Sequence, residues 1–257
     1  HAVLGTKAMS AITRGMHQAL KVPQWTPAMP KAFHVDKGLE ASQAKGSDKV
    51  VYFPSCINQT MGLPRKTPEK MALVNKMVSL LNKAGYEIIF PKGMEHMCCG
   101  TIWESKGMMD IADRKSRELE AALWEASEHG KYPVLCDQSP CLHRMRETIK
   151  KLHLYEPAEF ICTFLLDRLT ITPIDDTVAV HVTCSMRRMG TAHFIVDLAK
   201  MCAKHVVVPE GIGCCGFAGD RGFLHPEVNA YALRKLAPQL KENGVSRGYS
   251  NSRTCEI

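Results

Sequence analysis

Cysteines recur along this 257-residue chain in two sets with the same internal order. Each set has a single cysteine, then a Cys-Cys-Gly triplet, then a last cysteine: Cys56, Cys98-Cys99-Gly100 and Cys141 in the first copy, and Cys184, Cys214-Cys215-Gly216 and Cys255 in the second. Four converging thiolates suit soft metals, either a tetrahedral zinc ion or an iron–sulfur cluster. Two consecutive side chains are hard to aim at one ion, whereas a cluster offers several irons. The pattern therefore favours an iron–sulfur site in each copy, with zinc as the alternative.

The glycine after each cysteine pair has a predicted role of its own. Gly100 and Gly216 have no Cβ. The backbone there can approach the inorganic core of a cluster and donate N–H groups to its sulfides. We expect this close approach in both copies.

Three further cysteines lie outside the repeated set. Cys136 is five residues before Cys141, where the second copy has Ser250, so it is either an additional metal ligand of the first site or a structural residue. Cys162 and Cys202 lie within apolar helical patterns, and free cysteine is among the most often buried residue types. We expect these two to be small core residues.

Other polar residues near the cysteines carry weaker signals. His96 precedes the first pair and His181 lies on the strand before Cys184, but a lone histidine near a metal site is more often a hydrogen-bonded neighbour than a ligand. Arg187 and Arg188 follow Cys184; they either offset the negative charge of a thiolate cluster or form a solvated turn. No Gly-rich nucleotide loop and no Ser/His/Asp arrangement stands out, which disfavours a self-contained enzyme.

The cysteines recur because a longer segment is repeated. Residues 50–56 (VVYFPSC) match residues 178–184 (VAVHVTC), and Met-Gly follows each cysteine at the same distance. In each copy the pattern predicts a strand, a helix, a second strand and a second helix before the last cysteine. The predicted second strands cover 86–90 and 205–208, the first helices 73–84 and 195–202, and the second helices 111–126 and 228–240.

Strands that alternate with helices indicate parallel βαβ units. The predicted fold class is therefore α/β, with two pseudo-symmetric βαβ-type domains that have small parallel sheets. Ligand sites of such folds gather at the carboxyl ends of the strands. Short connections lead from these ends to the cysteines, so we expect each set of four to converge.

The repeat also predicts domain limits. Residues 49–175 form the first domain and residues 176–257 the second, which we expect to be truncated at its C-terminus. Residues 1–48 do not match the repeat and hold three prolines, which is typical of a linker or an arm from an upstream domain. The first copy is longer between its first cysteine and its cysteine pair, and we expect the insertion near residues 63–68.

Composition restricts the compartment and the partners. The net charge is +7, but basic residues occur in blocks no longer than a pair, so we expect no nucleic-acid partner. The chain has no apolar run of membrane-spanning length and its first residues have no secretory signal. Eleven cysteines, an odd number with two adjacent pairs, suit metal or redox chemistry in a reducing compartment better than a disulfide framework.

With these motifs, residues 49–257 resemble the cysteine-rich CCG-domain family, which includes the heterodisulfide reductase B subunit, the glycolate oxidase iron–sulfur subunit and the C subunit of anaerobic glycerol-3-phosphate dehydrogenase. The segments YFPSCINQTMG, CDQSPC, HVTCSMRRMG and SNSRTCEI are most similar to the C-terminal region of FAD-linked, iron–sulfur D-lactate dehydrogenases. In those proteins an FAD-binding domain and a ferredoxin-like domain precede the CCG repeats.

The resemblance implies electron transfer. Electrons would pass from D-lactate through FAD and up to two clusters, of the 4Fe-4S cubane or a non-cubane type, to a respiratory quinone or cytochrome. The location would be cytoplasmic, peripheral at the inner face of a bacterial membrane. Heterodisulfide reductase repeats end in Cys-x-x-Cys, whereas this chain has Gln138 and Ser252 at the earlier position. A zinc-holding structural module and a thiol–disulfide reductase are the alternative functions.

Overall fold

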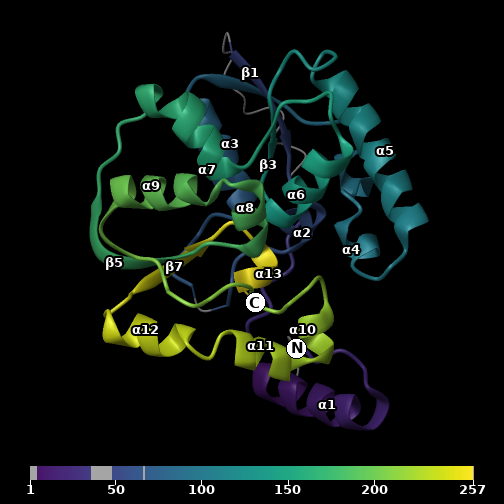
Figure 1. Ribbon diagram of the computed structural model, residues 1–257, viewed down its shortest axis with the longest axis vertical. Coiled ribbons are helices and arrows are strands. Elements are labelled where there is room, and N and C mark those ends of the chain that lie inside the picture. The colour runs from purple at the N-terminus through teal and green to yellow at the C-terminus, as the bar shows by residue number, and fades with distance from the viewer. Residues whose placement is uncertain (1–4, 36–47, 66, 257) are drawn as a thin grey trace.

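The computed structural model describes residues 5–35, 48–65 and 67–256 and has two parallel sheets (Figure 1). The first sheet has the strand order β2-β1-β3-β4, with β1 at Asp48–Phe53, β2 at Tyr86–Ile89, β3 at Val134–Cys136 and β4 at Leu154–Tyr155. The second sheet has the order β6-β5-β7, with β5 at Ile174–His181, β6 at Ala203–Val207 and β7 at Arg247–Ser250. Every pair of neighbouring strands is parallel. This confirms the predicted α/β class with two small parallel sheets.

Helices connect the strands in the same order in both copies. The first copy has α2 (Cys56–Thr60), α3 (Leu73–Lys83), α4 (Thr101–Glu104), α5 (Met109–Ala126) and α6 (Ser139–Thr148). The second has α8 (Cys184–Met189), α9 (Ala192–Cys202), α10 (Arg221–Leu224), α11 (Pro226–Ala232), α12 (Leu236–Glu242) and α13 (Arg253–Glu256). Outside this pattern lie α1 (Gly5–Leu20), η2 (Met94–His96), α7 (Pro157–Phe160), η3 (Ile161–Leu165) and η4 (Leu166–Arg168). None of the helices in the described part of the chain is long and apolar enough to cross a bilayer.

The first sheet is covered on both faces. Successive side chains of β1 point to opposite faces: Val50 and Tyr52 pack in one core with α3 and the α7 region, and Val51 and Phe53 pack in the other with α5 and α6. All four side chains are at most 1% exposed. A strand that is buried on both faces has apolar residues at every position. This explains why residues 50–53 do not alternate between apolar and polar residues.

The second sheet has a smaller core. Its buried cluster joins Val180 and Val182 to Met186 of α8 and Ile195 of α9. The residues of β7 are exposed or half-buried. Within the described residues, the second copy has no strand that corresponds to β4. The limits 49–175 and 176–257 for the two domains stay a prediction.

The longer connection of the first copy lies where the sequence predicts it. Residues 61–72 separate α2 from α3, whereas only Gly190 and Thr191 separate α8 from α9. Lys66, within this insertion, is outside the described residues. The insertion therefore lies between two helices and interrupts no strand.

One predicted helix of the second copy is wrong in its extent. The sequence pattern predicts a single helix over 228–240, but the structure has α11 and α12 with Leu233–Lys235 between them. Pro238 has no N–H and its ring excludes a helical carbonyl four residues earlier, at Arg234. A new helix therefore begins at Leu236, which places Pro238 in its first turn.

The carboxyl ends of the two sheets face each other. Ser139, just after β3, hydrogen-bonds through Oγ to Thr183 Oγ1 (2.9 Å) and Ser185 Oγ (2.8 Å), just after β5. Its backbone N–H donates to the carbonyl of Asn251, just after β7, at 3.0 Å. The buried hydroxyl groups are hydrogen-bonded to one another. The loops after β3, β5 and β7 therefore form one interface between the two copies.

The N-terminal segment lies against both copies. The sequence pattern does not predict its helix, α1. Gln24 N–H donates to the Phe223 carbonyl of the second copy at 2.8 Å, and Phe33 N–H donates to the Thr60 carbonyl of the first at 2.9 Å. Residues 1–4 and 36–47 of the predicted arm lie outside the described residues, and its role as a linker stays a prediction.

Candidate functional site

The four cysteines of the first set come from three neighbouring strand ends. Cys56 begins α2 after β1, the Cys98-Cys99 pair follows β2, and Cys141 lies in the first turn of α6 after β3. Side-chain hydrogen bonds join Cys56 to Cys98, Cys98 to Cys99, and Cys99 to Cys141. We call these four residues site one. The sheet brings them together because the carboxyl ends of its strands share one edge.

The second set repeats the arrangement. Cys184 begins α8 after β5, the Cys214-Cys215 pair follows β6, and Cys255 lies in α13 after β7. Cys184 is hydrogen-bonded to Cys214, which also contacts Cys215, and the Sγ atoms of Cys215 and Cys255 are 3.4 Å apart. These four residues form site two. Cys214 is exposed here, whereas at site one the exposed thiol is Cys56.

Each site holds a thiol that ionises easily. The pKa of Cys98 is lowered to about 3, first because Cys56 and then because Cys99 donates a hydrogen bond to its thiolate. Cys184 and Cys215 lower the pKa of Cys214 to about 2 in the same way. Their backbones contribute too, since Gly100 N–H and Gly216 N–H each donate to the thiolate two residues earlier at 3.4 Å.

The neighbouring thiols hold their protons more strongly. Burial and the thiolate of its partner raise the pKa of Cys56 and of Cys184, with the hydrogen bond to that thiolate as the largest cause. The pKa of Cys99 is lowered by Cys141 but raised by Cys98 and by burial, and lies at about 11. Without metal, each site therefore combines thiolate and thiol groups. The thiolate is the form that binds metals.

The two glycines have a steric requirement within the protein itself, and their predicted approach to a cluster stays a prediction. Gly100 has φ +92°, and a Cβ there would lie 2.4 Å from the Ala112 carbonyl oxygen and 2.8 Å from Arg144 Nε. Gly216 has φ +75° and a Cβ would lie 3.2 Å from Val228 Cγ1. At both positions the backbone packs closely against the following helix of the same copy, α5 or α11. A left-handed backbone in addition favours glycine at both positions.

The cysteines outside the repeat separate into two kinds. Cys136, at the end of β3, is fully buried, and its thiol lies near Cys99 and Cys141 while donating to the Gln138 carbonyl at 3.9 Å. Burial raises the pKa of its thiol well above the usual value. Cys162 lies in η3 with its thiol 3.7 Å from the Phe194 carbonyl, and Cys202 ends α9. Both are half-buried rather than fully buried, and neither belongs to a thiol site.

The two candidate histidines have different surroundings in the structure. His96 pairs with Glu95 at the surface, where its side chain is 86% exposed. His181 instead forms a hydrogen bond with the Cys255 thiolate, which together with the larger effect of Cys215 lowers the pKa of Cys255 to about 5. The first copy has Phe53 at the position of His181. Site two therefore has a polar neighbour that site one does not have.

The two arginines after Cys184 have different contacts. Arg187 donates to the Ile212 carbonyl at 3.2 Å and so holds the loop before the Cys214-Cys215 pair. Arg188 contributes positive charge that favours the Cys214 thiolate. Charge compensation therefore fits Arg188, whereas Arg187 positions a loop.

Two buried charged residues beside site one were not identified from the sequence. Arg144, 3% exposed, donates to the Cys99 carbonyl at 3.1 Å and pairs with Glu104 (2.8 Å) and Asp113 (2.7 Å). Asp137 accepts hydrogen bonds from Tyr52 Oη (2.7 Å) and Ser55 N–H (2.9 Å). Arginines on helices and aspartates after strands are common in proteins. The residue types at 144 and 137 therefore do not indicate from the sequence alone that these side chains lie beside a thiol site. Their role is to hold the loops that present the thiols.

The donor chemistry of both sites fits a thiolate-bound metal group. Each has four sulfur donors, of which two are consecutive, and at least one is a thiolate at neutral pH. Across residues 5–35, 48–65 and 67–256, no group of three or more His, Cys, Asp or Glu side chains is arranged to hold a single metal ion. The thiols contact one another in series instead.

Relatives were found among characterised proteins. The C subunit of the anaerobic glycerol-3-phosphate dehydrogenase of Escherichia coli is 24% identical over 238 residues, which cover 86% of this chain and 57% of that protein. The lactate utilization protein A of Oceanobacillus iheyensis is 22% identical over 183 residues, 64% of this chain and 72% of that protein. Lactate utilization protein A 1 of Bacillus mycoides is 23% identical over 185 residues, 66% of this chain and 74% of that protein. The chain thus spans little more than half the length of the Escherichia coli relative.

The match to a protein family follows the two copies. Residues 50–146 and 178–257 each match the family profile described as CCG, cysteine-rich domain. These ranges contain the eight cysteines of sites one and two and cover more than half of the chain. The chain therefore belongs to the CCG cysteine-rich domain family.

Proposed function

We propose that the chain is the iron–sulfur electron-transfer module of a flavin-linked D-lactate, or related 2-hydroxyacid, dehydrogenase. The observation that supports this most is the pair of four-thiol sites, each at the carboxyl edge of its own sheet and each with a low-pKa thiolate. Cysteine thiolates are the usual ligands of iron–sulfur clusters. The names of the relatives, one part of a glycerol-3-phosphate dehydrogenase and the other a lactate utilization protein, support a dehydrogenase system.

The contacts among the thiols support the following ligand sets. Cys56, Cys98, Cys99 and Cys141 hold the first group, with Cys136 as a fifth thiol because it lies beside Cys99 and Cys141. Cys184, Cys214, Cys215 and Cys255 hold the second, with His181 as the hydrogen-bonding neighbour of Cys255. When bound, such clusters, 4Fe-4S cubane or non-cubane, supply one-electron transfer. Arg144 and Asp137 hold the loops that present the thiols of site one, and Arg188 compensates the negative charge of the Cys214 thiolate at site two.

The remaining parts of the system are proposed from the family. An FAD-binding domain and a ferredoxin-like domain of the same polypeptide deliver the electrons, and a respiratory quinone or cytochrome receives them. The module works in the cytoplasm, peripherally attached to the inner face of the bacterial membrane. D-lactate and FAD act upstream, since neither site has the arrangement of a self-contained enzyme.

The test is the metal content of the chain expressed and purified without oxygen. We expect iron and acid-labile sulfide in comparable amounts, with an EPR signal on reduction. The double variant Cys98→Ala, Cys214→Ala removes the central thiolate of each site and should abolish both. The matched control is Cys162→Ala, Cys202→Ala, which removes two thiols outside the sites and should leave the iron content unchanged.

Three results would contradict the proposal. Stoichiometric zinc with no EPR signal under these conditions would identify a structural module. Iron-loaded protein that cleaves a small organic disulfide when reduced would identify a thiol–disulfide reductase. Equal iron in the two double variants would show that the thiol sites are not the ligands.

A further inference from the structure

The two copies carry different residues at one pair of neighbouring strand positions. In the first copy, Phe53 at the end of β1 is in register with Cys136 at the end of β3. In the second copy, the corresponding pair is His181 of β5 and Ser250 of β7. Residues in register on neighbouring strands share one face of a sheet, and the first pair indeed packs in one buried cluster. Each copy therefore has one strong metal donor at this place, a thiol on β3 and an imidazole on β5.

Both donors lie beside the last cysteine of their own copy. The thiol of Cys136 is close to Cys99 and Cys141 of site one. His181 is hydrogen-bonded to Cys255, which is the counterpart of Cys141 in the repeat. The imidazole thus reaches site two from the strand next to the one that carries the additional thiol at site one.

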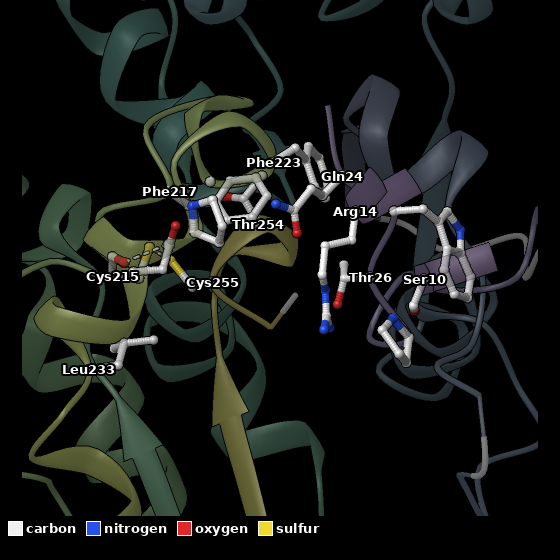
Figure 2. A pocket seen from close by; sticks show the side chains of 15 residues that line it. Ser10, Arg14, Gln24, Thr26, Cys215, Phe217, Phe223, Leu233, Thr254 and Cys255 are labelled. Carbon is white, nitrogen blue, oxygen red and sulfur yellow. Dashed lines mark hydrogen bonds between the residues drawn. The ribbon is translucent and has the colours of Figure 1, made fainter. Parts of the chain in front are cut away.

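An imidazole nitrogen that hydrogen-bonds a thiolate is already at the spacing of a second ligand. In zinc sites, metal–sulfur bonds of about 2.3 Å and metal–nitrogen bonds of about 2.0 Å at a tetrahedral angle place the two donor atoms about 3.5 Å apart. The Sγ atoms of Cys215 and Cys255 are at a similar spacing, 3.4 Å (Figure 2). His181 and Cys255 can therefore bind the same metal atom with little movement of the strands.

The opposite side of site two offers no comparable donor. Cys215 and Cys255 line a cavity of about 260 Å³, and residues of the N-terminal segment, among them Arg14 and Thr26, form its other wall (Figure 2). The lining, as far as the chain is described, contains no His, Asp or Glu side chain. A further donor from a protein side chain therefore has to come from the strand side, where His181 lies.

The acidic neighbour of Cys255 is already engaged. Glu256 follows this cysteine in the chain, and its carboxylate pairs with Arg253 at 2.6 Å. Arg253 in turn donates from Nε to Asn58 Oδ1 of the first copy at 3.3 Å. Binding of Glu256 to a metal would break this buried ion pair, whereas binding of His181 would not.

A buried hydroxyl beside His181 lacks a partner. Ser250 Oγ is shielded from solvent and makes no hydrogen bond within the described part of the chain. When one nitrogen of an imidazole binds a metal, the proton of the neutral ring is on the other nitrogen, which usually donates it to a nearby acceptor. The register places Ser250 next to His181, so its hydroxyl is available as that acceptor.

We propose that the imidazole of His181 is a fifth donor to the metal group of site two, alongside the four thiols of that site. It takes the part that the Cys136 thiol has at site one. The inference rests on the proposed function, because it needs an iron–sulfur group at site two. An imidazole ligand is neutral and a thiolate is negative, and histidine in place of cysteine raises the reduction potential of such groups. Site two should therefore accept an electron more readily than site one.

The test isolates site two and identifies the nitrogen by spectroscopy. In the background variant Cys98→Ala, Cys99→Ala, site two is the site that keeps its full set of thiols. The chain is prepared without oxygen, with natural or isotope-labelled histidine, and is reduced and studied by pulsed EPR. We expect the strong nitrogen coupling of a directly bound imidazole, which changes with the isotope. His181→Phe, which introduces the residue type of the first copy, should abolish this coupling.

The matched control is His205→Phe. His205 is exposed on the neighbouring strand β6 and is in register with Thr177, away from the carboxyl end of β5, so the coupling should stay unchanged. Loss of iron to a chelator gives a second readout. It should be about tenfold faster in His181→Phe and return to the background rate in His181→Cys, which supplies a fifth thiol. His181→Gln can hydrogen-bond Cys255 but is a poor iron ligand, and should not restore the rate.

Three results would overturn the inference: only the weak nitrogen coupling of a hydrogen-bonded imidazole, strong coupling that persists in His181→Phe, or iron retention in His181→Gln equal to that of the background. Circular dichroism establishes that each variant is folded, and the isotope comparison on the background needs no change at His181. Iron at site two without strong nitrogen coupling removes only this inference. Absence of iron both from the background and from the Cys214→Ala, Cys215→Ala variant removes the proposed function as well.

Discussion

Gln138 and Ser252 occupy the same position in the two copies and hydrogen-bond to each other. Each lies three residues before the last cysteine of its copy, and Gln138 Nε2 is 3.3 Å from Ser252 Oγ. Gln138 Oε1 also accepts from the Arg253 N–H at 3.0 Å. At this position heterodisulfide reductase repeats have a cysteine. In this chain the two residues join the copies, so site one and site two are mechanically linked through the connections after β3 and β7.

Gln138→Ala should destabilise the folded chain through this interface. The side chain is 3% exposed, and its loss leaves the Arg253 N–H without its acceptor. We expect a decrease of about 1–2 kcal/mol in the free energy of unfolding. Urea denaturation followed by circular dichroism measures it, with the exposed Gln18→Ala as the control. Equal midpoints for the two variants would show that the link contributes nothing to stability.

Gly100→Ala should lower the stability of the folded chain far more than a glycine-to-alanine substitution before the other cysteine pair. The added Cβ would meet the Ala112 carbonyl oxygen at 2.4 Å, and the backbone at φ +92° is strained for any other residue. Together these effects cost about 3 kcal/mol or more. Gly213→Ala is the matched control, because nothing lies within 4 Å of a Cβ there and its φ is not positive. Thermal unfolding compares the two, and a similar Tm would disprove the proposed close contact with α5.

The repeated sequence pattern was sufficient to predict the central strands and the place of the longer connection. Residues 50–53 and 178–181 lie in the central strands β1 and β5, and the longer connection of the first copy, between α2 and α3, contains the expected insertion at 63–68. The break between α11 and α12 was missed because apolar spacing continues through it while Pro238 prevents one continuous helix. The steric requirement for Gly100 and the contacts of Arg144 were not predictable, since both depend on how closely α5 packs on the cysteine loop. Nor does the sequence pattern show that residues of the N-terminal segment line a cavity beside Cys255.

Cys136→Ala should weaken metal binding at site one if Cys136 is its fifth thiol. The experiment uses a Cys214→Ala, Cys215→Ala background, so that site one is the site that retains its full set of thiols. Loss of a ligand or of its close neighbour weakens metal affinity by about tenfold or more. We therefore expect faster loss of iron to a chelator and an altered EPR signal.

The control for this experiment is Cys162→Ala in the same background. Cys162 is also a free thiol but lies in η3, away from site one, so iron loss should stay at the rate of the background. If Cys136→Ala and Cys162→Ala lose iron equally slowly and have the same spectrum, then Cys136 is a structural core residue.

Glu156 should make stability decrease as the pH rises toward neutrality. This fully buried carboxyl caps α7 by accepting from Glu159 N–H at 2.9 Å, and it also accepts from the Asn251 side chain. Burial raises its pKa from 4.5 to about 7. The native state therefore binds the proton more tightly than the unfolded state. The resulting stabilisation is complete below pH 4.5 and is lost as the pH rises through 7.

The variant Glu156→Gln cannot ionise and should remove this dependence. Relative to the variant, the wild-type chain should lose at most about 3 kcal/mol of unfolding free energy between about pH 4.5 and about pH 8. Urea denaturation at several pH values, with both proteins in the same metal state, measures the difference. Glu242→Gln, exposed at the end of α12, should keep the wild-type slope. A constant difference between wild type and Glu156→Gln across this range would mean that Glu156 is ionised throughout, with its charge stabilised by Asn251 and the α7 backbone.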